Sequence, residues 1–327
     1  MTPSSAAPDV SVIIPTWKAA RYVERTVASA LASSGVRLEI VIVDDASPDA
    51  TFEVLEALAK SDERVRVDQL PANGGPSVAR NRAIELSVGR YIAVLDADDA
   101  LEANRLAELV GIADEQAVDI IVDNMIEVDD QGRRLSAEPF LRSPAFAKAR
   151  TIDLSTWVNF NRPMKPGDCL GYLKPMFRRA TLTRLGQRYD AALRNSEDYY
   201  FVADLLAAGA RMHYCPSAGY HYQRSTASTS HRLSPAQTQA WLEAEAAFQA
   251  RHANTFSVSE LAALGARAWV LREVHQLVAA IDMVKAKRFG SVAGLLASDP
   301  AAAASTLSSF ARIALAKATG RSAFGRD

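Results

Sequence analysis

Three short runs of apolar, mostly β-branched residues alternate with stretches in which apolar residues recur at helical spacing. The runs are residues 10–14 (VSVII), 39–43 (EIVIV) and 91–95 (YIAVL), and such runs are typical of strands buried on both faces. The helical stretches between them cover residues 19–33, 51–60 and 76–87. Strands and helices in alternation predict an α/β fold with a Rossmann-like, mostly parallel sheet flanked by helices. Apolar residues at 120–122 and 125–128 are expected to continue this sheet.

The pattern changes at residue 235, where strand signals stop and Ala, Leu, Gln and Ser recur with helical periodicity. We therefore expect a main domain over residues 1–234 and a helical C-terminal region over residues 235–327. Residues 284–327 carry seven basic and two acidic residues, a local net charge of +5. Leu307, Phe310, Ile313 and Ala314 fit one side of a helix there. Two interpretations remain open: a helix packed on its own domain with a solvated basic face, or peripheral contact with an anionic membrane surface.

Composition narrows the function classes. Among 327 residues, 37 are basic and 38 acidic, so the formal net charge is −1. This balance lacks the broad positive field of a protein that coats nucleic acid, and no nucleic-acid partner is expected. Two cysteines, Cys169 and Cys215, make no disulfide framework. Residues 1–9 show no secretory leader pattern and no later window is apolar enough to span a bilayer, so a cytoplasmic location is expected.

Carboxylates follow directly after two of the predicted strands. One strand runs into Asp44 and Asp45, and another runs into Asp96, Asp98 and Asp99. Because ligands of parallel sheets bind beyond the carboxyl ends of the strands, both clusters are expected to face one cleft. Clustered carboxylates favour Mg²⁺ or Mn²⁺, whose shell is normally completed by water and substrate phosphates, so the pattern indicates a nucleoside diphosphate ligand. The alternative is helix capping and solvated turns.

A Gly- and Pro-rich turn lies between the two acidic clusters. Residues 71–76 read PANGGP, and Pro76 suits the first turn of the following helix. The free N–H groups at that helix start, with Arg80 and Arg82 one to two turns later, are suited to phosphate. An ordinary loop is the alternative.

The chemistry of several other enzyme classes requires motifs that are missing from this sequence. PTWK follows the first strand in place of G-x-G-x-x-G, which disfavours a dinucleotide-dependent dehydrogenase. The P-loop, zinc-ligand spacings and the G-x-S-x-G elbow are also missing from the sequence.

A second acidic pair opens a predicted helix near residue 197. Ser196 is expected to cap this helix, with Glu197 and Asp198 in its first turn. Capping accounts for these acids as well as function does. The functional interpretation is that one carboxylate faces the cleft and accepts a proton from a substrate hydroxyl.

Taken in order, these segments resemble the family 2 inverting glycosyltransferases of the GT-A fold. The resemblance covers residues 10–230 and rests on VSVIIPTWKAARYVERTVASAL, EIVIVDDASPDAT, NGGPSVARNRAIE, YIAVLDADD and the acidic pair in RYDAALRNSEDYYF. The segment GYLKPMFRR also resembles bacterial enzymes that extend succinoglycan-type exopolysaccharides.

The resemblance implies roles for individual residues. Pro15 and Thr16 would line the nucleotide pocket, Asp45 would contact the uracil or its equivalent, and Arg80 would lie near the base or diphosphate. Asp96 would face the ribose, and Asp98 would hold Mg²⁺ or Mn²⁺, with Asp99 as an alternative ligand. Asp198 would be the general base that deprotonates the acceptor hydroxyl.

One segment departs from the family pattern. Many relatives carry a Tyr-Arg-x-His type segment after the acidic pair, whereas here residues 220–225 read YHYQRS and TASTSHR follows. His221 is a candidate for the metal or diphosphate and Arg224 for phosphate, while a structural role for His221 is the alternative. The Q-x-x-R-W segment of processive synthases is missing, so one sugar per encounter is expected.

The substrates expected from the resemblance are a UDP-sugar donor, with UDP-glucose as the specific guess, and a glycan or lipid-linked oligosaccharide acceptor. Surface or exopolysaccharide synthesis at the inner membrane face would fit the basic tail. Two other functions stay open. A sugar-nucleotide nucleotidyltransferase would ordinarily show a glycine-rich segment after the first strand, where PTWKAARY has none. A non-catalytic nucleotide-sugar-binding protein is the other.

Overall fold

The three predicted strands form the parallel half of a mixed sheet. In the computed structural model, which describes residues 7–164, 167–224 and 233–319 and their side chains up to residue 312, β1 (Val10–Thr16) pairs in parallel with β2 (Leu38–Asp44) and β4 (Tyr91–Val94). The strand β3 (Val65–Gln69), which the sequence pattern did not reveal, adds a parallel edge beside β2. The side chains of β1, β2 and β4 are almost all buried, which is the physical reason for their continuous apolar runs.

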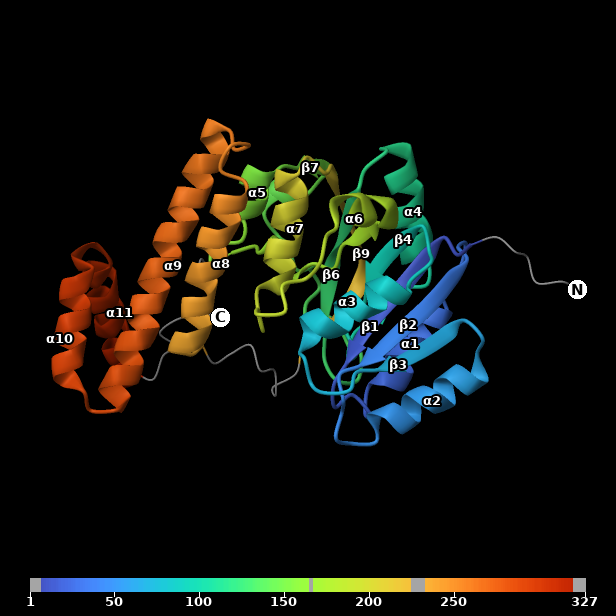
Figure 1. Cartoon of the computed structure of the whole chain (residues 1–327), viewed down its shortest axis with the longest axis horizontal. Coiled ribbons are helices and arrows are strands. Elements are labelled where there is room, and N and C mark those ends of the chain that lie inside the picture. The colour runs from blue at the N-terminus through green and yellow to red at the C-terminus, as the bar shows by residue number, and fades with distance from the viewer. Residues whose placement is uncertain (1–6, 165–166, 225–232, 320–327) are drawn as a thin grey trace, which may run out of the picture. The chain divides into compact units, whose positions relative to one another are not determined.

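Beyond β4 the sheet changes direction. A three-residue strand, β8 (Met176–Arg178), lies antiparallel between β4 and β6 (Ile120–Val128), so β6 is not the direct neighbour of β4. The long strand β9 (Met212–Gln223) then runs parallel to β6 and is flanked by β5 (Ala100–Leu101) and β7 (Arg150–Ile152), both antiparallel to it. The described part of the chain thus forms one sheet in the order β3-β2-β1-β4-β8-β6-β9-β5, with β7 on β9 (Figure 1).

Helices pack against this sheet at the predicted positions. The three predicted helices are α1 (Val23–Leu31), α2 (Thr51–Ser61) and α3 (Pro76–Leu86). In α1, Val23, Val27 and Ala30 are fully buried, so its apolar stripe faces the core. The remaining elements here are α4 (Arg105–Glu115), η1 (Pro144–Phe146), α5 (Leu154–Asn159), η2 (Leu170–Tyr172), α6 (Arg179–Leu185) and α7 (Glu197–Ala207). The expectation of an α/β fold with a mostly parallel sheet flanked by helices is confirmed.

The chain divides into two compact units: Met1–Trp157 with Asp168–Ser228, and Val158–Gly167 with Thr229–Asp327. Residues 158–164 group with the C-terminal helices, although they precede the predicted boundary at residue 234. The second unit contains α8 (Pro235–Arg251), α9 (Val258–Lys285), α10 (Phe289–Ser298) and α11 (Pro300–Thr319). Trp241, Leu271 and Val274 form an apolar cluster between α8 and α9.

The helices α8 and α9 of the second unit both begin with capping boxes. Ser234 and Gln237 satisfy each other's backbone N–H groups at the start of α8, and Ser257 and Glu260 do so at the start of α9. Within the described residues, no helix combines the length and the apolar character needed to cross a bilayer.

Candidate active site

The predicted acidic residues lie where β2 and β4 end. Asp45 directly follows β2, and its carboxylate accepts hydrogen bonds from the backbone N–H groups of Gly74 (2.6 Å) and Gly75 (2.8 Å) and from the amide of Asn73 (2.8 Å). Gly75 has φ +89°, a backbone conformation that residues with a Cβ rarely adopt. The turn between β3 and α3 is therefore fastened to the end of β2, and this anchorage fixes the start of α3.

Arg80, one turn into α3, joins the acids of two other elements. Its Nη2 contacts Asp96 Oδ1 at 2.9 Å, and its Nη1 contacts Glu197 Oε1 at 2.8 Å and Asp198 Oδ1 at 3.5 Å. Burial opposes the charge on Arg80, but the three carboxylates hold its pKa well above the usual value. The acids after β4 and those opening α7, which lie about 100 residues apart in the sequence, thus share one buried cation.

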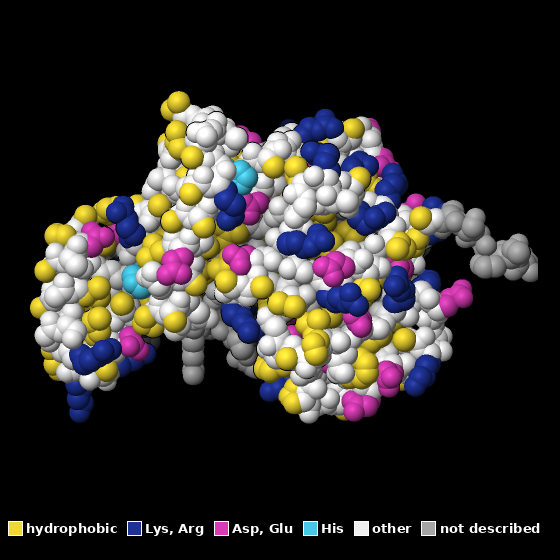
Figure 2. Space-filling view, in the orientation of Figure 1, with side chains coloured by type: hydrophobic (Ala, Val, Ile, Leu, Met, Phe, Trp, Pro, Cys, Tyr) yellow, Lys and Arg dark blue, Asp and Glu magenta, His cyan; other side chains and the backbone are white. Residues whose placement is uncertain are grey.

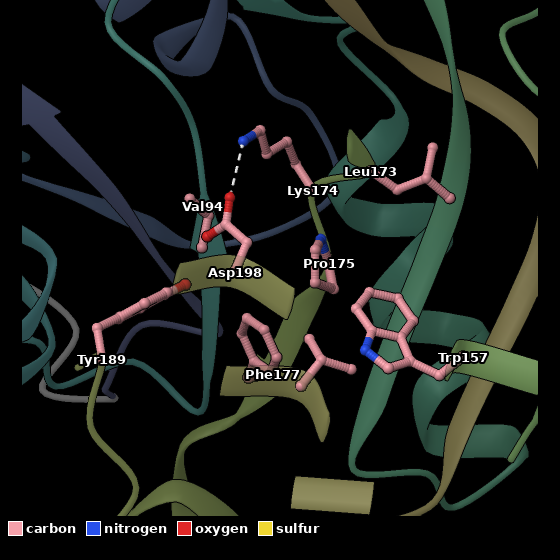
Figure 3. Close-up of a pocket in the computed structure, with 9 residues that line it drawn as sticks. Val94, Trp157, Leu173, Lys174, Pro175, Phe177, Tyr189 and Asp198 are labelled. Atoms are coloured by element: carbon pink, nitrogen blue, oxygen red, sulfur yellow. Dashed lines mark hydrogen bonds and ion pairs between the residues drawn. The ribbon is translucent and has the colours of Figure 1, made fainter. Parts of the chain in front are cut away.

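A second buried cation, Lys174, bridges Asp96 and Asp198. Its Nζ lies 2.8 Å from Asp96 Oδ2 and 3.2 Å from Asp198 Oδ2, and the Lys174–Asp198 contact is drawn in Figure 3. Burial works against ionisation of Asp96, yet Lys174 and Arg80 hold the pKa of its carboxyl below the usual range. Lys174 was not among the site residues predicted from the sequence. Its one distinguishing feature there is that it is a lone lysine inside the otherwise apolar segment GYLKPMF.

Glu197 and Asp198 stand at the start of α7, as the sequence predicted, but Ser196 does not cap the helix with its side chain. Ser196 occupies the N-cap position with φ 64°, and no side-chain capping bond forms. The first-turn acids are instead turned to Arg80 and Lys174, so capping is not their main interaction. Burial and the neighbouring charge of Asp198 raise the pKa of Glu197.

The adjacent residues Asp98 and Asp99 have different environments. Asp99 is buried and accepts hydrogen bonds from the Tyr220 hydroxyl (2.6 Å) and from the Gln223 N–H (2.7 Å). Asp98 is half-buried, and no hydrogen bond or ion pair joins its carboxylate to another described residue. Burial and the charge of Asp96 raise the pKa of Asp98.

The remaining predicted residues lie around this cluster. Pro15 and Thr16 end β1, and the Thr16 hydroxyl is 3.2 Å from an Asp44 carboxylate oxygen, so Asp44 fastens the strand ends together. Arg82 lies outside the cluster, paired with Asp68 at 2.6 Å. His221 on β9 has its Nε2 2.9 Å from Glu102, and Arg224 pairs with Glu127 at 3.3 Å. The TASTSHR segment lies outside the described residues.

A small pocket opens beside Asp198 (Figure 3). Lys174, Asp198 and Tyr189 contribute its polar groups, and its other walls are apolar. The apolar wall residues are Val94, Trp157, Leu173, Pro175, Phe177 and Val202. Tyr189 stacks on Phe201 with ring centroids 4.0 Å apart, and the Arg80 guanidinium lies 5.4 Å from the Tyr189 ring centroid. One side of the charged cluster is therefore shielded by apolar and aromatic groups, which strengthens its internal electrostatic interactions.

The fit of a divalent ion depends on which carboxylates remain available. Among the described residues, no set of three or more His, Cys, Asp or Glu side chains is close enough together to hold a metal ion. No described cation forms an ion pair with the Asp98 carboxylate, although the charges of Lys174 and Arg25 act on it. The oxygens of Asp99 accept hydrogen bonds from protein groups, and the Nε2 of His221 lies 2.9 Å from Glu102 without a hydrogen bond to a described residue. The donor set therefore fits an ion held by Asp98 together with substrate phosphates and water.

The sequence matches a known protein family. The sequence model of glycosyl transferase family 2 matches residues 11–180. The succinoglycan biosynthesis protein ExoU of Rhizobium meliloti (strain 1021) is 35% identical over 306 residues, covering 91% of this chain and 86% of that protein. ExoO of the same strain, also a succinoglycan biosynthesis protein, is 37% identical over 246 residues, covering 75% and 69%.

Solved structures with the same fold are more distant in sequence. S. aureus TarS in complex with UDP superposes with a TM-score of 0.60 at 21% identity, covering 81% of this chain and 70% of that one. The mannosyltransferase PcManGT from Pyrobaculum calidifontis, in complex with GDP-Man and Mn²⁺, gives a TM-score of 0.58 at 20% identity, covering 95% and 81%. Because the family match spans more than half of the sequence and two relatives exceed 30% identity over most of it, this chain belongs to glycosyl transferase family 2.

Proposed function

We propose that this chain transfers a sugar from a nucleoside diphosphate donor to a hydroxyl group of a glycan acceptor, with inversion at the anomeric carbon and with Asp198 as the general base. The observation that carries the proposal is the shared charge cluster: Asp198 and Asp96 are joined through Lys174 and Arg80. A base and a donor-side carboxylate held at a fixed separation provide what a single displacement needs.

The reaction follows from these roles. Asp198 accepts the proton of the acceptor hydroxyl while its oxygen bonds to the anomeric carbon, and the bond from that carbon to the diphosphate oxygen breaks on the opposite face. Thr16, Pro15 and Asp45 would hold the nucleoside at the ends of β1 and β2, and Asp96 would face the ribose. Arg80 keeps Asp96 in place and adds positive charge near the diphosphate.

A Mg²⁺ or Mn²⁺ ion bound by Asp98 and the donor phosphates would supply neutralisation of the charge on the departing nucleoside diphosphate. The half-buried, unpaired carboxylate of Asp98 supports this assignment. The neighbouring Asp99 stays in the proposal as an alternative ligand only if its hydrogen bonds to Tyr220 and Gln223 are given up on binding. The Nε2 of His221, which lies 2.9 Å from Glu102 without a hydrogen bond to a described residue, stays in the proposal as a further candidate ligand.

The substrate assignment rests on the relatives. ExoU and ExoO are succinoglycan biosynthesis proteins, so we propose that this chain acts in exopolysaccharide synthesis with UDP-glucose as donor and a glycan or lipid-linked oligosaccharide as acceptor. TarS structures contain UDP or UDP-GlcNAc, and PcManGT contains GDP-Man, so the two sugar nucleotides, UDP-GlcNAc and GDP-Man, belong in the donor screen.

The helical region supports a peripheral membrane contact during this reaction. No residue of α10 is buried, and Phe289 at its start is 66% exposed. Lys285, Lys287 and Arg288 directly precede it, and Figure 2 shows Lys and Arg side chains gathered at the lower left, where α9 turns into α10. Sedimentation with anionic vesicles tests the contact: we expect binding that falls with salt and is lost on Phe289→Ser. Equal sedimentation of the variant would contradict it.

The transfer proposal is tested with purified protein, each nucleotide sugar and Mn²⁺, by following nucleoside diphosphate release with and without acceptor. Chelation should abolish turnover and added Mn²⁺ should restore it. Asp198→Asn should retain donor binding and lose 10²- to 10⁴-fold in kcat, whereas the control Asp68→Asn, which breaks a surface ion pair in the same unit, should stay near wild type. Near-full activity of Asp198→Asn would refute the role of Asp198.

The same experiment separates the alternatives. Pyrophosphate released from a nucleoside triphosphate and a sugar phosphate would indicate the nucleotidyltransferase. Binding of nucleotide sugars without turnover for any acceptor would indicate the non-catalytic binding protein.

A further inference from the structure

Lys174 is buried between the two acids that the reaction depends on. Its side chain is 9% exposed, and its Nζ reaches one oxygen of Asp96 and one of Asp198. Burial opposes the ammonium charge, but the carboxylates of Asp198 and Asp96 hold the pKa of Lys174 well above its ordinary value. Lys174 therefore stays charged at neutral pH and does not compete with Asp198 for the acceptor's proton.

The backbone of Lys174 is fixed independently of its side chain. Its carbonyl oxygen accepts a 2.7 Å hydrogen bond from Arg105 Nη2, and Arg105 forms a 2.7 Å ion pair with Asp123. Arg105 and Asp123 are both almost fully buried. Lys174 also lies between η2 and β8, so the sheet holds the chain on its C-terminal side. Because its backbone is fixed, the length of the Lys174 side chain sets where its Nζ holds the Asp96 and Asp198 carboxylates.

The other polar groups around Asp198 do not take over the role of Lys174. Arg80 faces Asp198 from α3 at 3.5 Å, but its shorter contacts go to Glu197 and Asp96. Tyr189 also faces Asp198. Burial, and after it the charge of Asp198, raises the pKa of the Tyr189 hydroxyl. With three acids against two cations in the cluster, removal of Lys174 leaves Arg80 as its one cation among the described residues.

We propose that Lys174 is a positioning residue of the transfer reaction, which holds the Asp198 carboxylate in register with Asp96 and thus with the donor. The proposal rests on the proposed function. Lys174 contacts neither the reacting carbon nor the acceptor in this assignment and acts through Asp198. Because misplacement of a catalytic group by about 1 Å can cost about 10²-fold, its loss should appear in kcat.

The test compares Lys174→Met with Arg90→Met, which removes an ion-paired surface cation of the same unit outside the cluster. With the donor and acceptor that the wild type uses, Lys174→Met should lower kcat by about 10²-fold with a few-fold change in donor KM, while Arg90→Met stays within a few-fold of wild type. If Lys174→Met fails to fold, Lys174→Gln, which keeps hydrogen-bond donors and removes the charge, takes its place with the same expected loss.

A double variant separates positioning from a general structural effect. If Lys174 acts through Asp198, adding Lys174→Met to Asp198→Asn should lower kcat less than threefold further, because the group it positions has already been disabled. Losses that multiply in the double variant would overturn the proposal, and so would a single Lys174 variant with wild-type kcat. A wild-type protein that transfers no sugar would refute the proposed function instead.

Discussion

The neighbouring carboxylates of Asp98 and Asp99 differ in whether protein groups bind their oxygens. Asp99 is turned into the protein, where two donors on β9 use its oxygens. Asp98 keeps a carboxylate with no described protein partner, beside the cation-paired Asp96. The three acids of the D-x-D-D motif therefore differ: Asp96 is ion-paired, Asp98 has no described protein partner, and Asp99 is hydrogen-bonded to β9.

This difference predicts opposite effects of two alanine substitutions. Asp99→Ala leaves the Tyr220 hydroxyl and the Gln223 N–H without their acceptor, so the free energy of unfolding should fall by about 2 kcal/mol. Asp98→Ala removes no described hydrogen bond or ion pair and relieves the repulsion from Asp96, so it should unfold at or slightly above the wild-type temperature. With UDP and Mn²⁺ present, the wild type should gain thermal stability, and Asp98→Ala should lose that gain.

Thermal denaturation of both variants, with and without ligand, checks the assignment. If Asp98→Ala responds to Mn²⁺ and UDP as strongly as the wild type does, Asp98 is not the ion's ligand. A response lost in Asp99→Ala at unchanged stability would transfer that role to Asp99.

The elements around the site depend on a few anchoring turns. The turn before α3 is held by Asp45, and its geometry decides where Arg80 lies on α3. Gly75 is the N-cap of that helix, and a Cβ at its position would lie 2.5 Å from Arg194 Nη1. The backbone conformation of Gly75 thus requires glycine, whereas the exposed Arg194 side chain can move away from a Cβ.

Gly75→Ala should therefore lower the free energy of unfolding by about 1–3 kcal/mol and, by displacing the start of α3, also lower kcat. Gly111→Ala is the matched control, because Gly111 lies within α4 and a Cβ there meets no atom within 4 Å. Alanine is the better helix former, so this control should be stabilised by up to about 1 kcal/mol. Urea denaturation compares the two, and equal stabilities would contradict the anchoring role of the turn.

A buried ion pair holds the other side of the site. Arg105 on α4 and Asp123 on β6 have side chains 1% and 2% exposed, and their nearest atoms are 2.7 Å apart. Asp123→Ala strands the guanidinium in the core and should cost about 3–5 kcal/mol. Replacing both partners with apolar residues, Arg105→Met with Asp123→Leu, should cost less than the single change. Calorimetric unfolding of the two variants tests this order. A double variant less stable than Asp123→Ala would contradict the prediction.

The sequence reveals those elements whose burial leaves a repeating pattern. Residues 39–43 and 91–94 lie on β2 and β4, whose side chains are all buried, so their apolar runs are continuous and the acids after them mark the site. The strand β8 is too short for any periodicity, and Lys174 just before it belongs to no regular element. Its pairing with Asp96 and Asp198 arises from tertiary folding, which brings residues 24 and 78 positions apart to one point, and no local pattern records such a contact.

At the scale of the whole molecule, the two units have cores of their own, and each contains a partly buried histidine. His213 lies on β9 in the first unit, and His275 lies on α9 in the second, where its Nδ1 is 2.9 Å from the Thr238 hydroxyl. Burial lowers the pKa of both side chains below the usual value of 6.5. Folding therefore keeps these histidines neutral at a pH where the unfolded chain takes up protons.

The sign of the pH dependence follows from this difference. A group whose pKa is lowered by folding stabilises the folded state fully above its unfolded pKa, and this contribution is lost as the pH falls through the folded pKa. His275→Gln keeps a neutral partner for Thr238 but cannot take up a proton. The advantage of the wild type over His275→Gln in the free energy of unfolding should therefore be constant from pH 8 to about 7 and should shrink below about 6.5. Urea denaturation of both proteins at each pH, with helicity followed by circular dichroism, measures the difference, and an advantage that grows on acidification would show that the His275 imidazolium is stabilised in the fold.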